Sequence, residues 1–262
     1  MQGLFPLVLS LSCSHAQAAC SKPLQAPVAP ISYSVIVQGA HISGVYIDIL
    51  RALKNCEVVF TPTPRARAEA LFESGKADLL FPATKTPKRD EYGVFVPLVA
   101  ARATIISPHV KLGSLQAVLE QKNLRAGLVR GFDYGAAYQE FLKNMEKQGR
   151  LTLESDTVNV ARLMQAGLID LTVMAPSIFV PVVSTDIRST PLLDKLQFTP
   201  AQELPWGESG IYISKTMVNA QDMRYLQEGL QNLVQSGQVW RSFLQYYKPD
   251  VLEGSIKPRH KP

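Results

Sequence analysis

The stretch ADLLFPATKTPKRDEYGVFVPLVAARATIISP, residues 77–108, indicates how the chain is organised. Its apolar run Leu79–Phe81 predicts a short buried strand, and a polar turn follows over residues 82–89. A segment rich in valine and proline then leads into a second strand-like run, residues 103–107. Arg89 in the polar turn suits an anion, because a planar guanidinium donates two parallel hydrogen bonds to a carboxylate and stays charged at any working pH. The alternative is an ordinary exposed arginine, since most arginines are exposed.

The same stretch resembles the ligand loop of the periplasmic solute-binding proteins that serve polar amino-acid ABC transporters. In that family a strand ends in small hydroxyl residues, and Thr-Pro-x-Arg, an aromatic or acidic pair and Phe-x-x-Pro follow. Here Thr86–Arg89 matches the second element, and Phe95–Pro97 is one residue shorter than the last. The resemblance implies that Arg89 clamps a ligand carboxylate. It places beside Arg89 the hydroxyl of Thr84 and the strand residues Phe81, Pro82 and Ala83.

The residues before this stretch predict alternating strands and helices. We expect strands over residues 31–37 and 57–60, and helices over residues 43–54 and 65–76. The order β-α-β-α-β implies a parallel sheet with right-handed crossovers, in which ligands bind at the carboxyl ends of the strands. Arg65 follows a strand at that edge and is a second candidate cation, and Tyr33 on the first strand is a further candidate contact.

After Pro108 the alternation restarts as a second α/β unit. We expect strands over residues 124–130, 151–153 and 171–174, and helices over residues 114–121, 134–148 and 158–167. The segment LRAGLVRGFDYGAAYQEF, residues 124–141, resembles the second lobe of the binding proteins, where a strand, a Gly turn and a helix N-terminus face the ligand. Amides at a helix N-terminus favour an anion. This adds Arg130, Asp133 and Tyr134 to the candidates. Arg65 and Arg130 could instead be ordinary surface charges, since most arginines are exposed.

A return strand over residues 206–214 and two helices, about 220–236 and 239–247, complete the chain. The resemblance implies an α/β fold of the type-2 periplasmic binding class, with two lobes, each a mostly parallel sheet flanked by helices, and two crossing strands as a hinge. Lobe one comprises residues 19–107 and 199–250, and lobe two residues 108–198. Residues 251–262, rich in proline and polar residues, are expected to be a flexible tail.

One position departs from the amino-acid binders of that family. In those proteins an Asp after a lobe-two strand holds the ligand ammonium, and the matching residue here is Ala175. A methyl group cannot neutralise a buried cation, and a desolvated ammonium without a partner is costly. With Arg65, Arg89 and Arg130 as candidate cations, we expect a carboxylated or otherwise anionic solute in place of a neutral or cationic amino acid.

The N-terminus predicts export. Residues 1–18 contain no charged side chain, and Leu4–Leu11 is an apolar run too short to span a bilayer. Ala16-Gln17-Ala18 is a small-x-small cleavage site, so we interpret residues 1–18 as a secretory signal peptide and expect a periplasmic protein. The alternative to a secretory signal peptide is a lipoprotein signal to which Cys13 belongs. Cleavage leaves Cys20 and Cys56, and an even number of cysteines in an exported chain predicts a disulfide.

The remaining features narrow the functional class. The net charge is +5, but the basic residues are scattered, which argues against nucleic-acid binding. We find no metal, phosphate-loop, dinucleotide or nucleophile motif, so we expect no cofactor, no metal and no enzymatic activity. We expect a monomer that delivers a small solute to an inner-membrane ABC permease. The alternatives are a sensor module for a membrane partner and an enzyme on the same fold, such as a dehydratase.

Overall fold

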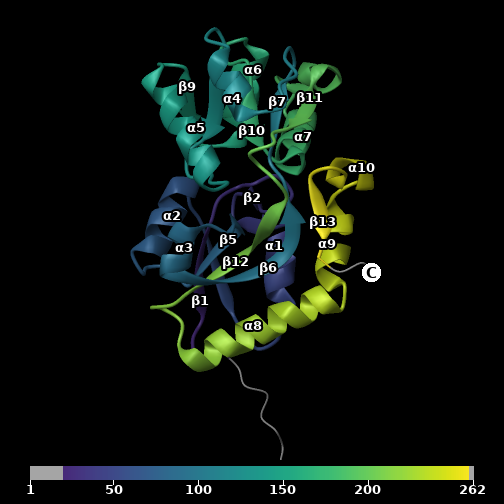
Figure 1. Ribbon diagram of the computed structural model, residues 1–262. Helices are drawn as coiled ribbons and strands as arrows, with labels where there is room; N and C mark the ends of the chain where they lie inside the picture. Colours follow the sequence, from purple (N-terminus) through teal and green to yellow (C-terminus); the bar gives the residue numbers. More distant parts are fainter. Residues whose placement is uncertain (1–19, 260–262) are drawn as a thin grey trace, which may run out of the picture.

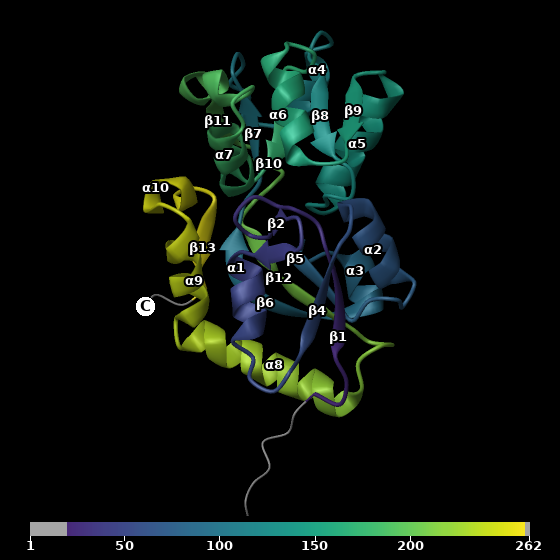
Figure 2. The ribbon, with the colours of Figure 1, turned by 180° about the vertical axis from the view of Figure 1, so that it is seen from behind.

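The computed structural model describes residues 20–259, which form two α/β lobes joined by two connections (Figures 1 and 2). The interpreted signal peptide, residues 1–18, lies outside the described residues. The chain passes from lobe one to lobe two between Ala101 and Thr104 and returns between Pro200 and Gly207. Two α/β lobes with a double crossing agree with the predicted fold class, but the four-stranded and three-stranded sheets are antiparallel, and the named strands pair parallel only in β1–β4 and β8–β9 of the described chain, so the expected mostly parallel sheets are not found.

Lobe one has two groups of strands. Four strands pair antiparallel in the order β13-β6-β12-β5, and β1 pairs parallel with β4 and lies against β5. The strands are β1 (Leu24–Val28), β4 (Val58–Pro62), β5 (Leu79–Thr84), β6 (Gly93–Ala101), β12 (Gly207–Ser214) and β13 (Ile256–Pro258). A short hairpin, β2 (Ile36–Gln38) and β3 (His41–Ser43), precedes the first helix. The helices are α1 (Val45–Arg51), α2 (Arg65–Glu73), α3 (Pro87–Tyr92), α8 (Ala220–Gln235), α9 (Gln238–Tyr246) and α10 (Pro249–Leu252).

Lobe two repeats the plan on a smaller scale. Strand β8 pairs parallel with β9, and β7 lies between β10 and β11 as an antiparallel sheet. The strands are β7 (Thr104–Ser107), β8 (Ala126–Val129), β9 (Leu151–Glu154), β10 (Thr172–Met174) and β11 (Gln197–Pro200). The helices are α4 (Leu115–Glu120), α5 (Ala136–Lys147), α6 (Thr157–Gln165), α7 (Pro176–Thr185) and a 3-10 helix (Thr190–Lys195). Side-chain oxygens of Ser114 and Asp156 cap α4 and α6, which is why these helices begin where the sequence predicts.

Two local predictions are wrong. The first long strand is β1 at Leu24–Val28, whereas residues 31–35 form only isolated bridges. Pro27 and Pro30 obscured the strand pattern, but β1 is buried through pairing with β4, 30 or more residues later. Residues 87–89, expected as the end of a turn, belong to the short helix α3 (Pro87–Tyr92), with Thr86 as its cap and Pro87 at its first position.

The expected flexible tail is also ordered in the described part of the chain. Helix α10 follows α9, and β13 pairs antiparallel with β6, with Ile256 opposite Ala101. The side chains of Leu252 and Ile256 belong to the core of lobe one, and their burial stabilises the segment. Polar composition alone therefore gave the wrong expectation for residues 251–259.

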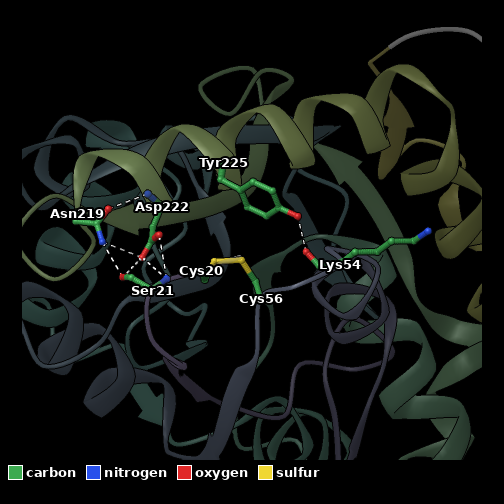
Figure 3. The surroundings of a disulfide bond; sticks show 7 residues. All are labelled: Cys20, Ser21, Lys54, Cys56, Asn219, Asp222 and Tyr225. Atoms are coloured by element: carbon green, nitrogen blue, oxygen red, sulfur yellow. Dashed lines mark hydrogen bonds between the residues drawn. A yellow bond between two sulfur atoms is a disulfide. The ribbon is translucent and has the colours of Figure 1, made fainter. Parts of the chain in front are cut away.

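The predicted disulfide between Cys20 and Cys56 is present, with the two Cα atoms 4.9 Å apart (Figure 3). Beside it, the buried carboxylate of Asp222 on α8 accepts hydrogen bonds from the amide and hydroxyl of Ser21. The hydroxyl of Tyr225, also on α8, donates to the carbonyl of Lys54. The bond and these contacts fasten the start of the described chain to lobe one.

Candidate functional site

A pocket lies between the two lobes and is lined by residues from both. The lobe-one side contains residues from the ends of β5 and β6, from the start of α2 and from α9. The lobe-two side contains residues from the β8–α5 loop and the start of α7. The lining residues are Ile31, Ser34, Tyr46, Arg65, Pro82, Ala83, Thr84, Arg89, Ala101, Phe132, Asp133, Tyr134, Ala175, Ser177, Ile178, Ser209, Phe243 and Ile256.

Arg65 is the first residue of α2 and is 4% exposed. Pro64 precedes it and allows the helix to begin at that point. One terminal nitrogen of Arg65 donates to the carbonyl of Phe81 at 3.4 Å, and the other lies 3.3 Å from Oε2 of Glu69. Its Nε is buried without a hydrogen-bond partner. Arg65 therefore contacts the pocket with incomplete hydrogen bonding, which is costly for a buried donor.

Arg89 is 2% exposed and is held by α3, whose cap Thr86 accepts a hydrogen bond from the amide of Arg89. Its Nε and Nη2 donate to the two carboxylate oxygens of Glu69 at 2.6 and 3.2 Å, and its Nη1 donates to the carbonyl of Thr84 at 2.9 Å. The structure thus places a protein carboxylate on the guanidinium that the sequence assigned to a ligand.

Two buried guanidinium groups share the single carboxylate of Glu69. Burial alone would raise the pKa of Glu69, but Arg65 and Arg89 together lower it below the usual range. Burial lowers the pKa of Arg65 to about 10, and Arg89 adds to this effect, although Glu69 opposes it. At neutral pH all three groups are charged, so this cluster carries one excess positive charge beside the pocket.

On the lobe-two side of the pocket, the loop between β8 and α5 contributes Asp133 and Tyr134. Asp133 accepts a hydrogen bond from the amide of Gly135 at 2.8 Å and so shapes the loop before α5, whose N-cap is Gly135. Burial raises the pKa of Tyr134, which keeps its phenol neutral. Gly131 packs against the start of α2: a Cβ there would lie 3.0 Å from the backbone of Ala66 and 3.2 Å from Cγ of Arg65. The two lobes therefore touch directly at Gly131.

Eight of the predicted candidates line this pocket: Arg65, Pro82, Ala83, Thr84, Arg89, Asp133, Tyr134 and Ala175. Three do not. Phe81 is buried behind the pocket and stacks on Tyr46, with ring centroids 6.0 Å apart. Tyr33 packs edge to face on Tyr247. Arg130 directly follows β8, is exposed, donates to the carbonyl of Leu153 and does not line the interlobe pocket.

Several residues of the site were missed in the sequence. Glu69 lies four residues after Arg65, a spacing that places the two on one face of a helix and that indicated the ion pair. Tyr46 lies more than 150 residues before Ser209 and Phe243 in the sequence, and the Tyr46 hydroxyl lies 3.2 Å from Oγ of Ser209. No local signal brings these three side chains together.

The geometry defines a class of protein. The chain has the two-lobed type-2 periplasmic binding fold, in which a pocket lies between lobes joined by two crossing connections. No protein-family model matches the chain, and no curated protein matches it. Solved structures share its fold at 14–18% sequence identity.

Three of these structures illustrate the range of the fold. An ancestral arginine-binding protein bound to arginine is 16% identical, with a TM-score of 0.69, covering 86% of this chain and 98% of that one. A histidine kinase sensor domain with similarity to periplasmic binding proteins is 18% identical, with a TM-score of 0.69, covering 90% and 98%. A substrate-binding protein of an amino-acid ABC transporter from Streptococcus pneumoniae, bound to L-arginine, is 17% identical, with a TM-score of 0.66, covering 85% and 94%.

Within residues 20–259, no three His, Cys, Asp or Glu side chains come together as a possible metal site. No helix in the described part of the chain is both long and apolar enough to cross a membrane.

Proposed function

We propose that this protein is an extracytoplasmic solute-binding protein that captures a small carboxylated solute between its lobes and delivers it to an ABC-type permease. The observation that carries the proposal is the interlobe pocket bordered by two buried arginines and their one shared carboxylate. The fold supports solute capture, since the solved structures that share it include substrate-binding proteins of amino-acid ABC transporters.

The excess charge beside the pocket favours an anion. Arg65 lies 3.3 Å from Glu69, makes a 3.4 Å hydrogen bond to Phe81 and has one nitrogen without a partner, whereas each nitrogen of Arg89 has an acceptor. A ligand carboxylate next to Arg65 would balance the charge and supply the acceptors that Arg65 lacks. We therefore propose Arg65 as the principal anchor, with Arg89 contributing its charge to the pocket wall and with Thr84 and the backbone near Ala83 beside the ligand.

The opposite wall gives an ammonium group little support at the position used in amino-acid binders. Ala175 is 5% exposed and begins α7 without a polar side chain. Asp133 is the acidic side chain among the pocket-lining residues, and it already accepts the amide of Gly135. The proposed solute is accordingly held through its carboxylate, with Tyr46, Phe132, Phe243 and Ile178 packing on its apolar part.

A thermal-shift screen of amino acids, dicarboxylates, other small carboxylic acids and small peptides, followed by calorimetric titration, tests the proposal. A ligand that binds only the folded state raises the melting temperature, by an amount that grows with its concentration relative to its Kd. We expect one or more carboxylates without an α-ammonium to stabilise the protein. Tight binding of arginine, lysine or histidine, with no response to acids, would leave solute binding intact and overturn the carboxylated class.

A sensor module is a second candidate, because a histidine kinase sensor domain has the same fold over 90% of this chain. The discriminating measurement is reconstitution with a candidate ABC permease from the same organism. Ligand-dependent ATP hydrolysis by that permease supports transport, whereas no stimulation would favour sensing.

The expectation that the protein is not an enzyme is tested by incubating it with its ligand and following the ligand by NMR. Conversion of the ligand to a product would show that the protein is an enzyme.

We further propose that the protein is exported through residues 1–18 and acts as a monomer in the periplasm. The disulfide between Cys20 and Cys56 supports an oxidising compartment. Fractionation of cells with mass spectrometry of the N-terminus tests this location, and a mature chain beginning at Ala19 is the expected result.

A further inference from the structure

The C-terminal segment that follows α9, residues 249–259, lies alongside the hinge and reaches lobe two. In both views α10 and β13 extend beside α9 toward α7 of the other lobe (Figures 1 and 2). Helix α10 contacts α7, and β13 is the outer strand of the lobe-one sheet, paired with the end of β6 next to the hinge. The segment is therefore in a position to act on both lobes.

Its main contact with lobe two is a buried pair of serines. Oγ of Ser255 accepts a hydrogen bond from the amide of Ser177 at 3.0 Å and donates to Oγ of Ser177 at 2.9 Å. Both residues are at most 1% exposed. Ser177 is the second residue of α7, and the N-cap of that helix is Ala175, which has no side-chain acceptor. Ser255 thus performs from lobe one the role that a capping side chain normally performs within a helix.

The same segment is attached to both crossing connections. Arg102, on the first connection, donates its amide to the carbonyl of Ser255 at 2.9 Å and its guanidinium to the carbonyl of Gly254. Trp206, on the second connection, lies between two cations: Arg102 is 4.9 Å and Lys257 is 4.3 Å from its ring. Cation–π contacts of this kind link the segment to the part of the chain that must bend when the lobes move.

The segment also contributes to the pocket. Ile256 and its strand partner Ala101 both line it, as does Ser177. A change in the position of residues 249–259 would alter the pocket wall and the separation of the lobes together.

We propose that residues 249–259 are a clasp: they hold the lobes together across the hinge through Ser255 and Ser177, and they supply Ile256 to the wall of the ligand site. The link between lobes is independent of the proposed solute-binding function, whereas the role of Ile256 rests on it. Opening the lobes requires breaking the Ser255–Ser177 pair, which leaves the amide of Ser177 uncapped, so the clasp biases the ligand-free protein toward the closed form.

The test measures the distance between lobes without any ligand. Spin labels are attached to Lys76→Cys on lobe one and Lys122→Cys on lobe two, both exposed, in the proposed mature chain that begins at Ala19 and in which Cys20 and Cys56 remain bonded. Pulsed electron–electron double resonance then gives the distribution of distances between the two spin labels, and so of lobe separations. Ser255→Ala is expected to lower the ratio of closed to open molecules by roughly fivefold, the size of the loss of one helix cap.

Ser242→Ala is the matched control, because Ser242 is equally buried and its hydroxyl bonds only to Gln238 within α9. It should leave the distribution unchanged. A chain ending at Lys248 should open further than Ser255→Ala. If that truncated chain does not fold, the distance distribution of Ser255→Ala alone tests whether residues 249–259 hold the lobes together. Distributions for Ser255→Ala that match those of the unsubstituted protein would overturn the clasp, whether or not a solute is found.

Discussion

Glu69 holds the guanidinium of Arg89 through two hydrogen bonds, 2.6 and 3.2 Å long, while the same carboxylate lies 3.3 Å from Arg65. The residue that the sequence motif assigns to a ligand is thus already occupied by an acid of the protein. Any anion that enters the pocket interacts with the net positive charge of all three groups. Arg65 is the residue of the three whose Nε still lacks a hydrogen-bond acceptor.

Glu69→Gln should destabilise the fold by about 3 kcal/mol, because it leaves two buried cations without a counter-charge. Urea unfolding measures this change. Glu73→Gln is the control: Glu73 pairs with the exposed Lys88, and loss of such a surface pair costs less than about 1 kcal/mol. Equal losses for the two variants would contradict a structural role for the Glu69 cluster.

The contribution of Glu69 should depend on pH. Its pKa is lower in the folded than in the unfolded protein, so its stabilising effect is present above the ordinary carboxyl value of about 4.5 and is lost as the pH falls through the folded value. The difference in unfolding free energy between the unsubstituted protein and Glu69→Gln should therefore shrink on acidification below about pH 4.5. A difference that grows in acid would be inconsistent with this ion pair.

Arg65→Gln should weaken binding of the best carboxylate from the thermal-shift screen at least about tenfold, since it removes a buried charge-assisted contact. The fold should persist, because Glu69 keeps its bonds to Arg89. Arg130→Gln is the control, as Arg130 is exposed and outside the pocket. Calorimetric titration of both variants decides: unchanged affinity for Arg65→Gln would remove Arg65 from the site.

Gly131→Ala should hinder closure of the lobes. An added Cβ would lie 3.0 Å from the backbone of Ala66, and overpacking of this kind should lower the closed-to-open ratio at least about fivefold. Gly135→Ala is the control. Gly135 has a positive φ of +95°, similar to the +88° of Gly131, so both substitutions strain the backbone, but a Cβ at Gly135 would have no atom within 4 Å. Spin-label distances should therefore shift for Gly131→Ala and not for Gly135→Ala; a shift in both would point to loop strain.

Reduction of the Cys20–Cys56 bond should lower the free energy of unfolding by about 3–4 kcal/mol, the value that the chain-entropy model assigns to a loop of this length. The two cysteines are 36 residues apart. Denaturant unfolding of Cys20→Ser/Cys56→Ser protein provides the measurement. Thiol labelling of unreduced, unfolded protein should find neither cysteine free, and two labelled thiols would show that the bond is not formed.

The sequence by itself determined the alternation of strands and helices, which follows from local patterns such as the apolar run Leu79–Phe81 and the caps Ser114 and Asp156. The double crossing and the region of the proposed site came from the resemblance to the binding proteins, which the Thr86–Arg89 motif carries. Local patterns record which backbone conformation a segment prefers and which face it buries, and that information survives in a short window of residues.

The tertiary structure alone decided which charges meet and what the C-terminal segment does. Glu69 and Arg89 are 20 residues apart, and Ser177 and Ser255 are 78 apart, so no window of sequence contains their contacts. The strand β13 exists because Ile256 finds a buried place beside Ala101, despite a polar neighbourhood that by itself predicts a loose tail. Burial and pairing with distant segments outweigh local preference at such positions, because the free energy of removing apolar surface from water is set by the partner and not by the neighbouring residues.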